Sequence, residues 1–532
     1  MTTIREIDLD APRAAAVAPP PAPRWMGLVA GLVAGAVAVT GGMLVAAVVD
    51  VASPLDDVGS SFIDRTPMWL KDFAVEQFGT NDKTALRVGM VVVLAIAAAG
   101  FGVLAMRRRW IGAAGIAAFG VVGMLSAAER PDQPGRAVVP PLLGAIIGVA
   151  VLLWLVAGLV GQWVDSLTPG RSRVRDAWDR RRFLTATGGL AATAVVVGGT
   201  ARAIERRRVE DLVDQAPDTL PPASGAAVPD TSAADGGLVP GTPFITPNDD
   251  FYRIDTALSF PRIDLDSWTV RVHGMVDREI SITYEQLLAM PMVERTVTLA
   301  CVSNEVGGNL IGNAVWQGVL LADVLAEAGV QEGAEQVFSR SVDGFTCGFP
   351  VAAALDGRDC LIAIGMNGEA LPLAHGFPAR LVVPGLYGYV SATKWLKEIE
   401  LTTWDAEEGY WVPRGWSREA PIKTQSRIDV PRRGDDVNAG RVAVAGVAWA
   451  QHRGVAKVEV RVDDGPWQEA RLGDDGGDDA WRQWVYEWDA TEGDHRLQVR
   501  ATDRDGETQT EEVAPPAPNG ATGYHTRRVK VR

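Results

Sequence analysis

One of the three cysteines in this 532-residue chain, Cys301, stands where a thiol could do chemistry. It follows the apolar run Thr296–Ala300 and precedes a polar, glycine-rich stretch that ends at Asn309. This pattern predicts a strand that ends in a turn. A thiolate at a strand end, facing a loop, is well placed to bind a soft metal ion. A buried structural cysteine is the alternative interpretation.

The other two cysteines, Cys347 and Cys360, flank a short segment. Outside a cell they could form a disulfide, and two buried thiols are the alternative. The odd count leaves at least one thiol unpaired within the chain. The formal net charge of −15 argues against a nucleic-acid partner, because phosphate backbones are bound by basic patches.

The elements around Cys301 are expected to be short strands and short helices, which predicts a mixed α+β domain over residues 241–425. Trp268–Gly274 alternates as a strand does, and Leu320–Gly329 is typical of a helix with Gly329 as its C-terminal cap. Residues 426–532 carry short candidate strands separated by turn residues, which predicts an all-β, immunoglobulin-like sandwich without a disulfide.

The first part of the chain is apolar enough to cross a membrane repeatedly, since one helical span needs about 20 residues. The candidate spans are Trp25–Val49, Leu86–Met106, Trp110–Ala127, Val138–Val164 and the weaker Phe183–Ala201. Such a succession is rare in the cores of soluble domains. It predicts an N-terminal all-α transmembrane bundle of about five helices.

Basic residues give the expected orientation of these spans. Arginines cluster at 107–109 and at 171–182, and both clusters should be cytoplasmic by the positive-inside rule. Five spans that begin inside then place everything after Ala201 outside the cytoplasmic membrane. The segment Asp179–Leu184 resembles a twin-arginine export motif, which is used for domains exported already folded. An ordinary basic cluster is the alternative, and a retained anchor is favoured over cleavage.

All five histidines lie in the second half of the chain, and no Cys-x-x-Cys-His sequence occurs. No haem is therefore expected, and electrons must be exchanged with a separate partner. Anchoring is the simplest role for the spans, with docking to a quinone or to a redox protein as the alternative. Residues 209–240 are rich in Pro, Gly, Ala, Ser and Asp, which predicts a disordered linker.

Several motifs, in order, resemble those of the sulfite oxidase family of molybdenum enzymes, especially its bacterial membrane-attached members. Thr298–Asn304 is similar to the family's Thr-Leu-x-Cys-x-x-Asn, whose cysteine ligates molybdenum. Trp316–Leu325 is similar to the helix entry that follows, and Leu371–Arg380 to the pterin-phosphate segment. The resemblance covers about Thr242–Arg532, and its C-terminal part is similar to the family's dimerisation domain, so a homodimer is possible.

The resemblance implies a molybdenum–molybdopterin cofactor and two-electron oxygen-atom transfer. It makes Cys301 the metal ligand and, with Tyr410, a catalytic candidate. Arg380 and Lys394 would bind the pterin phosphate, with His375 as a further donor. The cofactor-binding residues it implies are Asn248, Phe251, Tyr252, Cys301, Ser303, Asn304, His375, Arg380 and Lys394.

Departures from the family pattern bear on the substrate. Sulfite-oxidising members place an arginine after the Asn of the cysteine motif, where this chain has Glu305, and Ile254–Thr256 replaces an Arg-Asn-His run. A carboxylate at that position would repel sulfite. The aromatic region around Tyr410 and Trp411 would suit a neutral sulfoxide or N-oxide, as in the family's periplasmic methionine sulfoxide reductase.

These observations predict a membrane-anchored, extracytoplasmic oxidoreductase that acts on a small-molecule substrate. The lipid bilayer is expected to surround its membrane spans. The expected segments are four transmembrane helices (1–168), a twin-arginine-like segment with the fifth anchor (169–208), the linker (209–240), the molybdopterin domain (241–425) and the sandwich (426–532). The alternative function is a cofactor-free immunoglobulin-like surface binding protein. A binding protein would explain why the arginines typical of sulfite-oxidising members are missing. It would not explain why Cys301 and the pterin-phosphate segment Leu371–Arg380 are present.

Overall fold

A computed structural model describes residues 22–67, 82–130, 135–160, 180–223 and 242–532, together with 70, 73, 77, 78 and 178. The chain divides into two compact units. The first comprises residues 1–129 and 133–205, and the second comprises 130–132 and 206–532. Because the placement of one unit against the other is not determined, each unit is described by itself.

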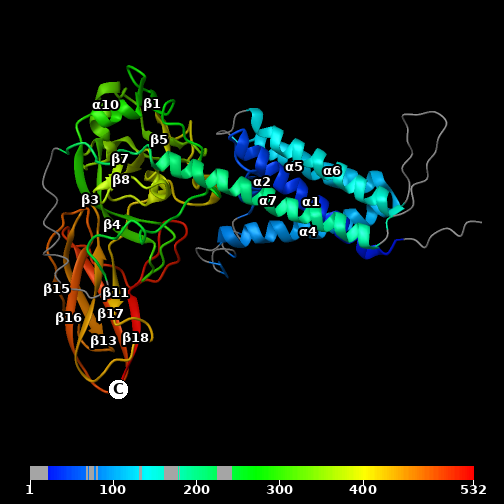
Figure 1. Ribbon diagram of the computed structural model, residues 1–532. Coiled ribbons are helices and arrows are strands. Elements are labelled where there is room, and N and C mark those ends of the chain that lie inside the picture. The colour runs from blue at the N-terminus through cyan, green and yellow to red at the C-terminus, as the bar shows by residue number, and fades with distance from the viewer. Residues whose placement is uncertain are drawn as a thin grey trace, which may run out of the picture. The chain divides into compact units, whose positions relative to one another are not determined.

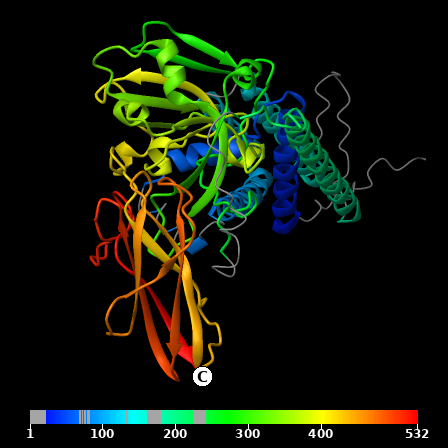
Figure 2. The same cartoon turned by 90° about the vertical axis from the view of Figure 1, so that its left-hand side faces the viewer.

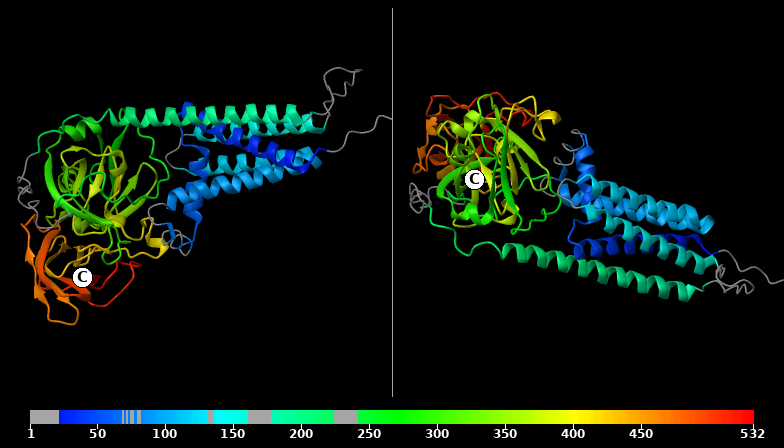
Figure 3. Two further views of the ribbon diagram at one scale, coloured as in Figure 1. Left: turned by 60° about the horizontal axis from the view of Figure 1, so that its bottom comes forward. Right: turned by 90° about the horizontal axis from the view of Figure 1, so that it is seen from above.

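The first unit is helical, and its long helices are the predicted spans. They are α1 (Arg24–Val48), α4 (Asp82–Arg107), α5 (Arg109–Ala128), α6 (Val139–Val160) and α7 (Arg180–Val213). The described part of the chain contains five helices long and apolar enough to cross a membrane. The end of the predicted fourth span, residues 161–164, lies outside the described residues. Figure 3 shows the helices, coloured blue to blue-green, with their long axes roughly aligned.

Small residues bring α1 close to α4. A Cβ atom built on Gly31 or Gly102 would overlap the backbone of the other helix, at the Ala98 oxygen and the Gly27 oxygen respectively. Such positions let helix backbones approach closely in a membrane, where van der Waals packing replaces the hydrophobic effect. A short helix, α2 (Pro54–Arg65), follows α1, and its N-cap residue Ser53 accepts a hydrogen bond from the backbone N–H of Asp56.

The helix α7 is longer than the predicted fifth span and enters the segment predicted as a linker. It ends at Val213 rather than at Ala201. Leu212 is buried in the core of the second unit, Leu220 packs against that core, and Gln317 Nε2 donates a hydrogen bond to the Pro221 oxygen at 2.6 Å. The expectation of a disordered linker from residue 209 was therefore wrong for residues 209–223, because its apolar side chains find a core to pack on. Residues 224–241 lie outside the described residues.

The second unit begins with an α+β domain built on two sheets (Figure 1). One sheet has the order β2-β1-β10-β5-β6, and the other has the order β3-β4-β7-β8 with β9 paired to β7. The strands of the first sheet are β1 (Thr269–Gly274), β2 (Ile280–Thr283), β5 (Gln336–Ser341), β6 (Thr346–Pro350) and β10 (Leu396–Thr402). Those of the second sheet are β3 (Val293–Ala300), β4 (Ile311–Leu320), β7 (Leu361–Met366), β8 (Glu369–Ala370) and β9 (Arg380–Val382).

Short helices connect these strands. They are α9 (Tyr284–Ala289), α10 (Leu321–Ala328), α11 (Val351–Leu355) and α12 (Gly388–Ser391). The helix α9 begins with a capping box, in which Thr283 and Gln286 satisfy each other's backbone N–H groups. As predicted, α10 ends at Gly329, which has a φ of 75°. The alternation of buried and exposed side chains in β1 matches the sequence pattern, since Val270 and Val272 are fully buried.

The C-terminal part of the second unit consists of two four-stranded antiparallel sheets around a separate core (Figure 2). Their orders are β11-β12-β16-β15 and β14-β13-β17-β18. The strands are β11 (Gln425–Val430), β12 (Gly440–Trp449), β13 (Val455–Val462), β14 (Gln468–Glu469), β15 (Arg471–Leu472), β16 (Arg482–Ala490), β17 (Gly493–Asp503) and β18 (His525–Val531). The short strands β14 and β15 belong to different sheets, and the buried Ala470 lies between them in the chain.

Candidate functional site

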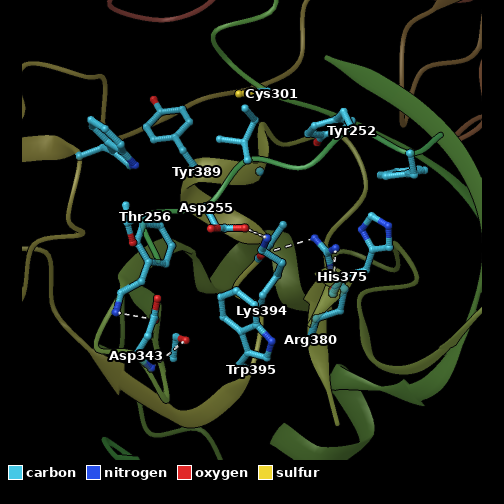
Figure 4. Close-up of a pocket in the computed structure, with 17 residues that line it drawn as sticks. Tyr252, Asp255, Thr256, Cys301, Asp343, His375, Arg380, Tyr389, Lys394 and Trp395 are labelled. Carbon is cyan, nitrogen blue, oxygen red and sulfur yellow. Dashed lines mark hydrogen bonds and ion pairs between the residues drawn. The ribbon is translucent and has the colours of Figure 1, made fainter. Parts of the chain in front are cut away.

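A cavity of about 800 Å³, measured together with its open mouth, lies in the α+β domain (Figure 4). Six of the residues expected to bind a cofactor line it, namely Phe251, Tyr252, Cys301, His375, Arg380 and Lys394. The fold therefore brings together side chains that are far apart in the sequence.

Cys301 lies directly after β3, as the sequence pattern predicts, and is 8% exposed. Its backbone N–H donates to the Leu310 oxygen at 2.9 Å, which closes the loop that follows it. Asn304 fastens the same loop, because its Oδ1 accepts a hydrogen bond from the Leu310 N–H at 2.8 Å. Burial raises the pKa of the Cys301 thiol, and hydrogen bonds from Ser303 act in the opposite direction by favouring the thiolate, the form that binds metals.

Arg380 is the most deeply buried cation of the cavity. Its Nη1 donates to the His375 oxygen at 3.1 Å, its Nη2 to the Ala392 oxygen at 3.4 Å, and its Cζ lies 5.0 Å from the centre of the Trp316 ring. Burial lowers the pKa of Arg380 to about 10, so the guanidinium still carries its charge at neutral pH. Within the described residues no carboxylate pairs with it. A buried cation with only carbonyl acceptors is costly unless an anionic ligand compensates it.

Lys394 is held differently, by a carboxylate. Its Nζ lies 2.7 Å from Asp255 Oδ2, which also accepts from Arg253 Nε at 2.9 Å. Burial lowers the pKa of Lys394 to about 8, although the Asp255 carboxylate opposes this change. The lysine therefore loses its charge more easily than an exposed lysine does, and Asp255 helps it to keep that charge.

His375 is neutral in this environment. Burial lowers its pKa to about 4, and the charges of Arg380 and Lys394 act in the same direction. Its Nε2 lies 2.9 Å from the Asn248 carbonyl oxygen, so Nε2 carries the proton that it donates there. The remaining ring nitrogen, Nδ1, is then an acceptor, and in this form His375 cannot donate to a phosphate as the resemblance implied.

Tyr252 stands within electrostatic reach of both the cysteine and the arginine. Burial and the negative charge of a Cys301 thiolate raise the pKa of its phenol, whereas Arg380 lowers it. The phenol is therefore protonated and can donate a hydrogen bond inside the cavity. The neighbouring Phe251 stacks on Tyr252 with ring centres 5.2 Å apart and meets the His375 ring edge-on at 5.6 Å.

Three of the expected cofactor-binding residues and one catalytic candidate do not line the cavity. They are Asn248, Ser303, Asn304 and Tyr410. The Asn248 side chain instead contacts Asn367 and Glu369. Tyr410 packs against Phe345 with ring centres 5.8 Å apart and lies under the Arg414 guanidinium. Tyr410 is therefore not among the residues that line this cavity, whereas the next residue, Trp411, is, and a catalytic role for Tyr410 stays a prediction.

The structure adds lining residues that sequence patterns had not singled out for the cavity, among them Tyr389, Asp343 and Phe345. Tyr389 follows the Leu381–Pro384 strand region, and Asp343 and Phe345 lie between β5 and β6. No motif links these segments, and only the pairing of distant strands joins them. Glu305 is exposed and is absent from the lining, so the expectation that its carboxylate would repel sulfite in this cavity is not supported.

The three cysteines are free thiols. Cys347 Sγ lies 3.0 Å from Thr393 Oγ1, and Cys360 Sγ donates to the Ala353 oxygen. Burial raises the pKa of both thiols, to about 12 for Cys360. The two-thiol alternative, not the disulfide, is therefore the arrangement in the structure.

The C-terminal sandwich supports the strand and the loop that carry Cys301. Trp481 donates its backbone N–H to Thr298 Oγ1 at 2.7 Å, three residues before the cysteine. Arg427 Nη1 donates to the Gly308 oxygen at 2.9 Å. The His525 ring packs directly on Gly307, where a Cβ atom would overlap it. The loop is therefore held from the sandwich side as well as by its own hydrogen bonds.

Comparison with known proteins defines the class of this protein. The family described as oxidoreductase molybdopterin binding domain matches residues 257–411, which carry most of the cavity wall. Residues 257–411 are therefore a molybdopterin-binding domain of the oxidoreductase type, which implies a molybdenum–molybdopterin cofactor. This result is at odds with the alternative of a cofactor-free binding protein.

The relatives define the family more narrowly. The chain is 33% identical to human mitochondrial sulfite oxidase over 325 residues (51% of this chain, 58% of the relative). It is 32% identical to the sulfite oxidase of Gallus gallus (51% and 69%) and 36% identical to the oxidoreductase YuiH of Bacillus subtilis (29% and 74%). The sulfane dehydrogenase SoxCD of Paracoccus pantotrophus matches at 25% identity and a TM-score of 0.48, over 54% of this chain and 81% of that one. The chain belongs to the sulfite oxidase family, and it spans 58% of the length of the first mammalian relatives it matches.

The cavity residues fit this cofactor. A single thiol, Cys301, suits a metal whose other soft ligands come from the pterin dithiolene, and Arg380 supplies a buried positive charge that lacks a carboxylate partner among the described residues. Elsewhere in the described part of the chain, no group of three or more His, Cys, Asp or Glu side chains could hold a metal ion.

Proposed function

We propose that this protein is a membrane-anchored, extracytoplasmic oxidoreductase that transfers an oxygen atom, with two electrons, to or from an organic small molecule such as a sulfoxide. One observation carries the proposal: the thiol of Cys301 and the buried guanidinium of Arg380 line the same cavity. The thiol suits the molybdenum end of a molybdenum–pterin cofactor, and the guanidinium suits its phosphate end.

The cofactor, when bound, supplies the two-electron redox chemistry at molybdenum. Cys301 is the proposed protein ligand, and Arg380 the principal phosphate-binding residue, with Lys394 as a weaker contributor because Asp255 already neutralises it. Tyr252 is proposed to hold a proton on a hydroxyl between these groups. Asn248, Ser303 and Asn304 are proposed to position the surrounding backbone.

The proposed direction is reduction, in which a sulfoxide, two electrons and two protons give a thioether and water. Sulfite is not the proposed substrate, because Ile254, Asp255 and Thr256 line the cavity where sulfite-oxidising members carry an Arg-Asn-His run. A separate electron carrier, a quinone or a redox protein, would supply the electrons.

The proposed location rests on the helical unit. Five apolar helices are compatible with multiple membrane spans. The arginines at 107–109 and at the start of α7 mark the proposed cytoplasmic side. The twin-arginine-like sequence that includes Arg180–Leu184 suits export of a domain already loaded with cofactor. We further propose that residues 426–532 form an immunoglobulin-like domain, that residues 242–425 form the molybdopterin domain, and that the sandwich can pair in a homodimer.

The test is the molybdenum content of the purified full-length protein by mass spectrometry, with pterin fluorescence measured on the same sample. About one metal and one pterin per chain are expected, and Cys301→Ser should change the coordination of the metal and abolish activity. Sulfoxides should be assayed before sulfite, with a reduced dye as electron donor. Absence of both metal and pterin, from cells that load another molybdenum enzyme, would overturn the proposal.

A further inference from the structure

The cavity has two sides with different side chains. In Figure 4, His375 and Arg380 lie on one side, and Tyr389 and Thr256 lie on the other. The first side carries the guanidinium that is assigned above to the pterin phosphate. The second side carries aromatic rings, and no part of the proposed function depends on them.

The rings of the second side form two layers. Tyr389 and Trp411 both pack on Trp416, with ring centres 5.7 and 6.4 Å away. Trp411 and Phe345 both pack on Tyr410, with ring centres 5.1 and 5.8 Å away. Tyr389, Trp411 and Phe345 line the cavity, whereas Tyr410 and Trp416 do not. The three lining rings, called the aromatic wall below, are therefore supported from behind by the other two.

Hydrogen bonds add to the rigidity of the aromatic wall. The Tyr389 hydroxyl donates to the Ser417 oxygen at 2.6 Å, so its proton is already used outside the cavity. The backbone N–H of Phe345 donates to Asp343 Oδ1 at 3.1 Å, which holds the chain that carries this ring. Rings that are fixed before a ligand arrives lose little conformational freedom when the ligand binds, and this favours affinity.

The chain that carries the aromatic wall passes close to the proposed metal ligand. Gly388, the neighbour of Tyr389 in α12, also lines the cavity. A Cβ atom built on Gly388 would lie 3.8 Å from the Ala300 oxygen and 3.8 Å from the Tyr252 hydroxyl oxygen. Ala300 directly precedes Cys301. A substrate whose reacting atom lies at the metal can therefore place a neighbouring substituent against the wall.

We propose that the aromatic wall of Tyr389, Trp411 and Phe345 binds an aryl group attached to the reacting sulfur, so that the substrates are aryl sulfoxides. Aromatic rings pack on one another edge-to-face or offset-stacked, and these contacts add to the burial of apolar surface. An aliphatic group of the same size gains only the burial. This inference rests on the proposed function, because it places the sulfur at a metal bound by Cys301.

The experiment compares the binding of methyl phenyl sulfoxide with that of methyl cyclohexyl sulfoxide, which carries a saturated ring with the same number of carbons. Calorimetric titration of the cofactor-loaded, full-length protein in detergent gives both dissociation constants, and without an electron donor neither compound is reduced. We expect the phenyl compound to bind at least about threefold more tightly. A smaller ratio, or no detectable binding of either compound, would overturn the inference.

Variants assign the preference to the aromatic wall. Trp411→Leu and Tyr389→Leu each remove a lining ring and should bring the ratio of the two dissociation constants below about twofold. Tyr389→Phe keeps the ring and should keep the preference. Trp467→Leu is the matched control, because Trp467 is a half-buried tryptophan that packs on Tyr524 and does not line the cavity. A preference that survives in both leucine variants of the wall contradicts the inference.

Molybdenum content and the reduction of dimethyl sulfoxide, measured on the same preparations, separate the two proposals. A loaded protein that reduces dimethyl sulfoxide but does not prefer the phenyl compound overturns this inference and leaves the proposed function standing. A protein without molybdenum, from cells that load another molybdenum enzyme, overturns the proposed function and this inference with it. Retention of the metal by the variants shows that they fold.

Discussion

At the residue scale, the burial of Arg380 and the acceptors of its hydrogen bonds determine its role more than its being an arginine does. Most exposed arginines lie in solvent, where an ion pair contributes little. Arg380 is instead 6% exposed, donates only to carbonyl oxygens and lies against the Trp316 ring. A guanidinium in these surroundings is stabilised most by a ligand that brings a negative charge.

The first prediction follows from this arrangement. Arg380→Met should lower the molybdenum and pterin content of the purified protein at least tenfold, because the phosphate loses its buried counter-charge. The apoprotein itself should keep or gain thermal stability, since methionine fills the site without an uncompensated charge. Both quantities can be measured on the same preparation, by metal analysis and by thermal unfolding.

The matched control is Arg340→Met, which removes an arginine that pairs with Glu398 outside the cavity lining. It should leave the cofactor content unchanged. Full cofactor content in Arg380→Met would remove Arg380 from the phosphate site.

His525 gives a prediction about pH. Burial lowers its pKa to about 4, while an unfolded histidine titrates near 6.5. Both states are neutral above pH 6.5, so the full contribution to stability is present there. As the pH falls from 6.5 toward 4, only the unfolded state gains a proton, and the folded state loses up to about 3 kcal/mol of stability from this residue.

The comparison is with His525→Asn, whose side-chain oxygen can replace Nδ1 as the acceptor for the Ile428 N–H. The temperature of thermal unfolding should fall less steeply between pH 7 and 4.5 in this variant than in the parent protein. His375, which has a similar shift, contributes equally to both proteins and cancels. Identical pH profiles would show that His525 is not the group that titrates.

At the element scale, close contact of the backbones fixes the pairing of α1 with α4. Gly102→Val should disrupt it, because any Cβ at this position would meet the backbone of Gly27 and Gly31. The variant should lose thermal stability in detergent by several degrees. Gly100→Val, two residues away on the same helix, is the control, because nothing lies within 4 Å of its Cβ position. Equal losses in both variants would point to helix propensity rather than to packing.

The other decisive element is the contact between the sandwich and the loop after Cys301. Thr298, Gly307 and Gly308 each touch a residue of the sandwich. The sandwich is therefore part of the scaffold of the site as well as a separate core. This explains why the predicted boundary at residue 426 separates two sequence patterns but not two independent structures.

At the scale of the whole molecule, the prediction concerns topology. Alkaline phosphatase, which is active only after export, should be active when fused after Arg532 and inactive when fused after Arg108. The physical reason is that basic loops resist transfer across the membrane. A protein whose C-terminal fusion is inactive while its Arg108 fusion is active would have the opposite orientation.

The sequence alone determined the features that depend on local pattern. The apolar stretches needed only length and composition to be recognised as spans, so α1, α4 and α5 begin and end within a few residues of their expected positions. Cys301 was predictable as a strand-end thiol because the pattern of β3 and of the turn after it is continuous. Arg380 was found because it ends the Leu371–Arg380 motif, and Lys394 was found because it follows that motif closely in the chain.

Only the tertiary structure decided which side chains face the cavity. Neighbouring residues such as Tyr410 and Trp411 point in different directions, and no sequence motif distinguishes them. Asp343 and Tyr389 line the cavity although no motif marks them, and the exposed Glu305 does not line it. The residues after 209 became ordered because a core lay within reach of Leu212 and Leu220. Local sequence sets the elements, whereas packing between distant segments sets the direction of each side chain.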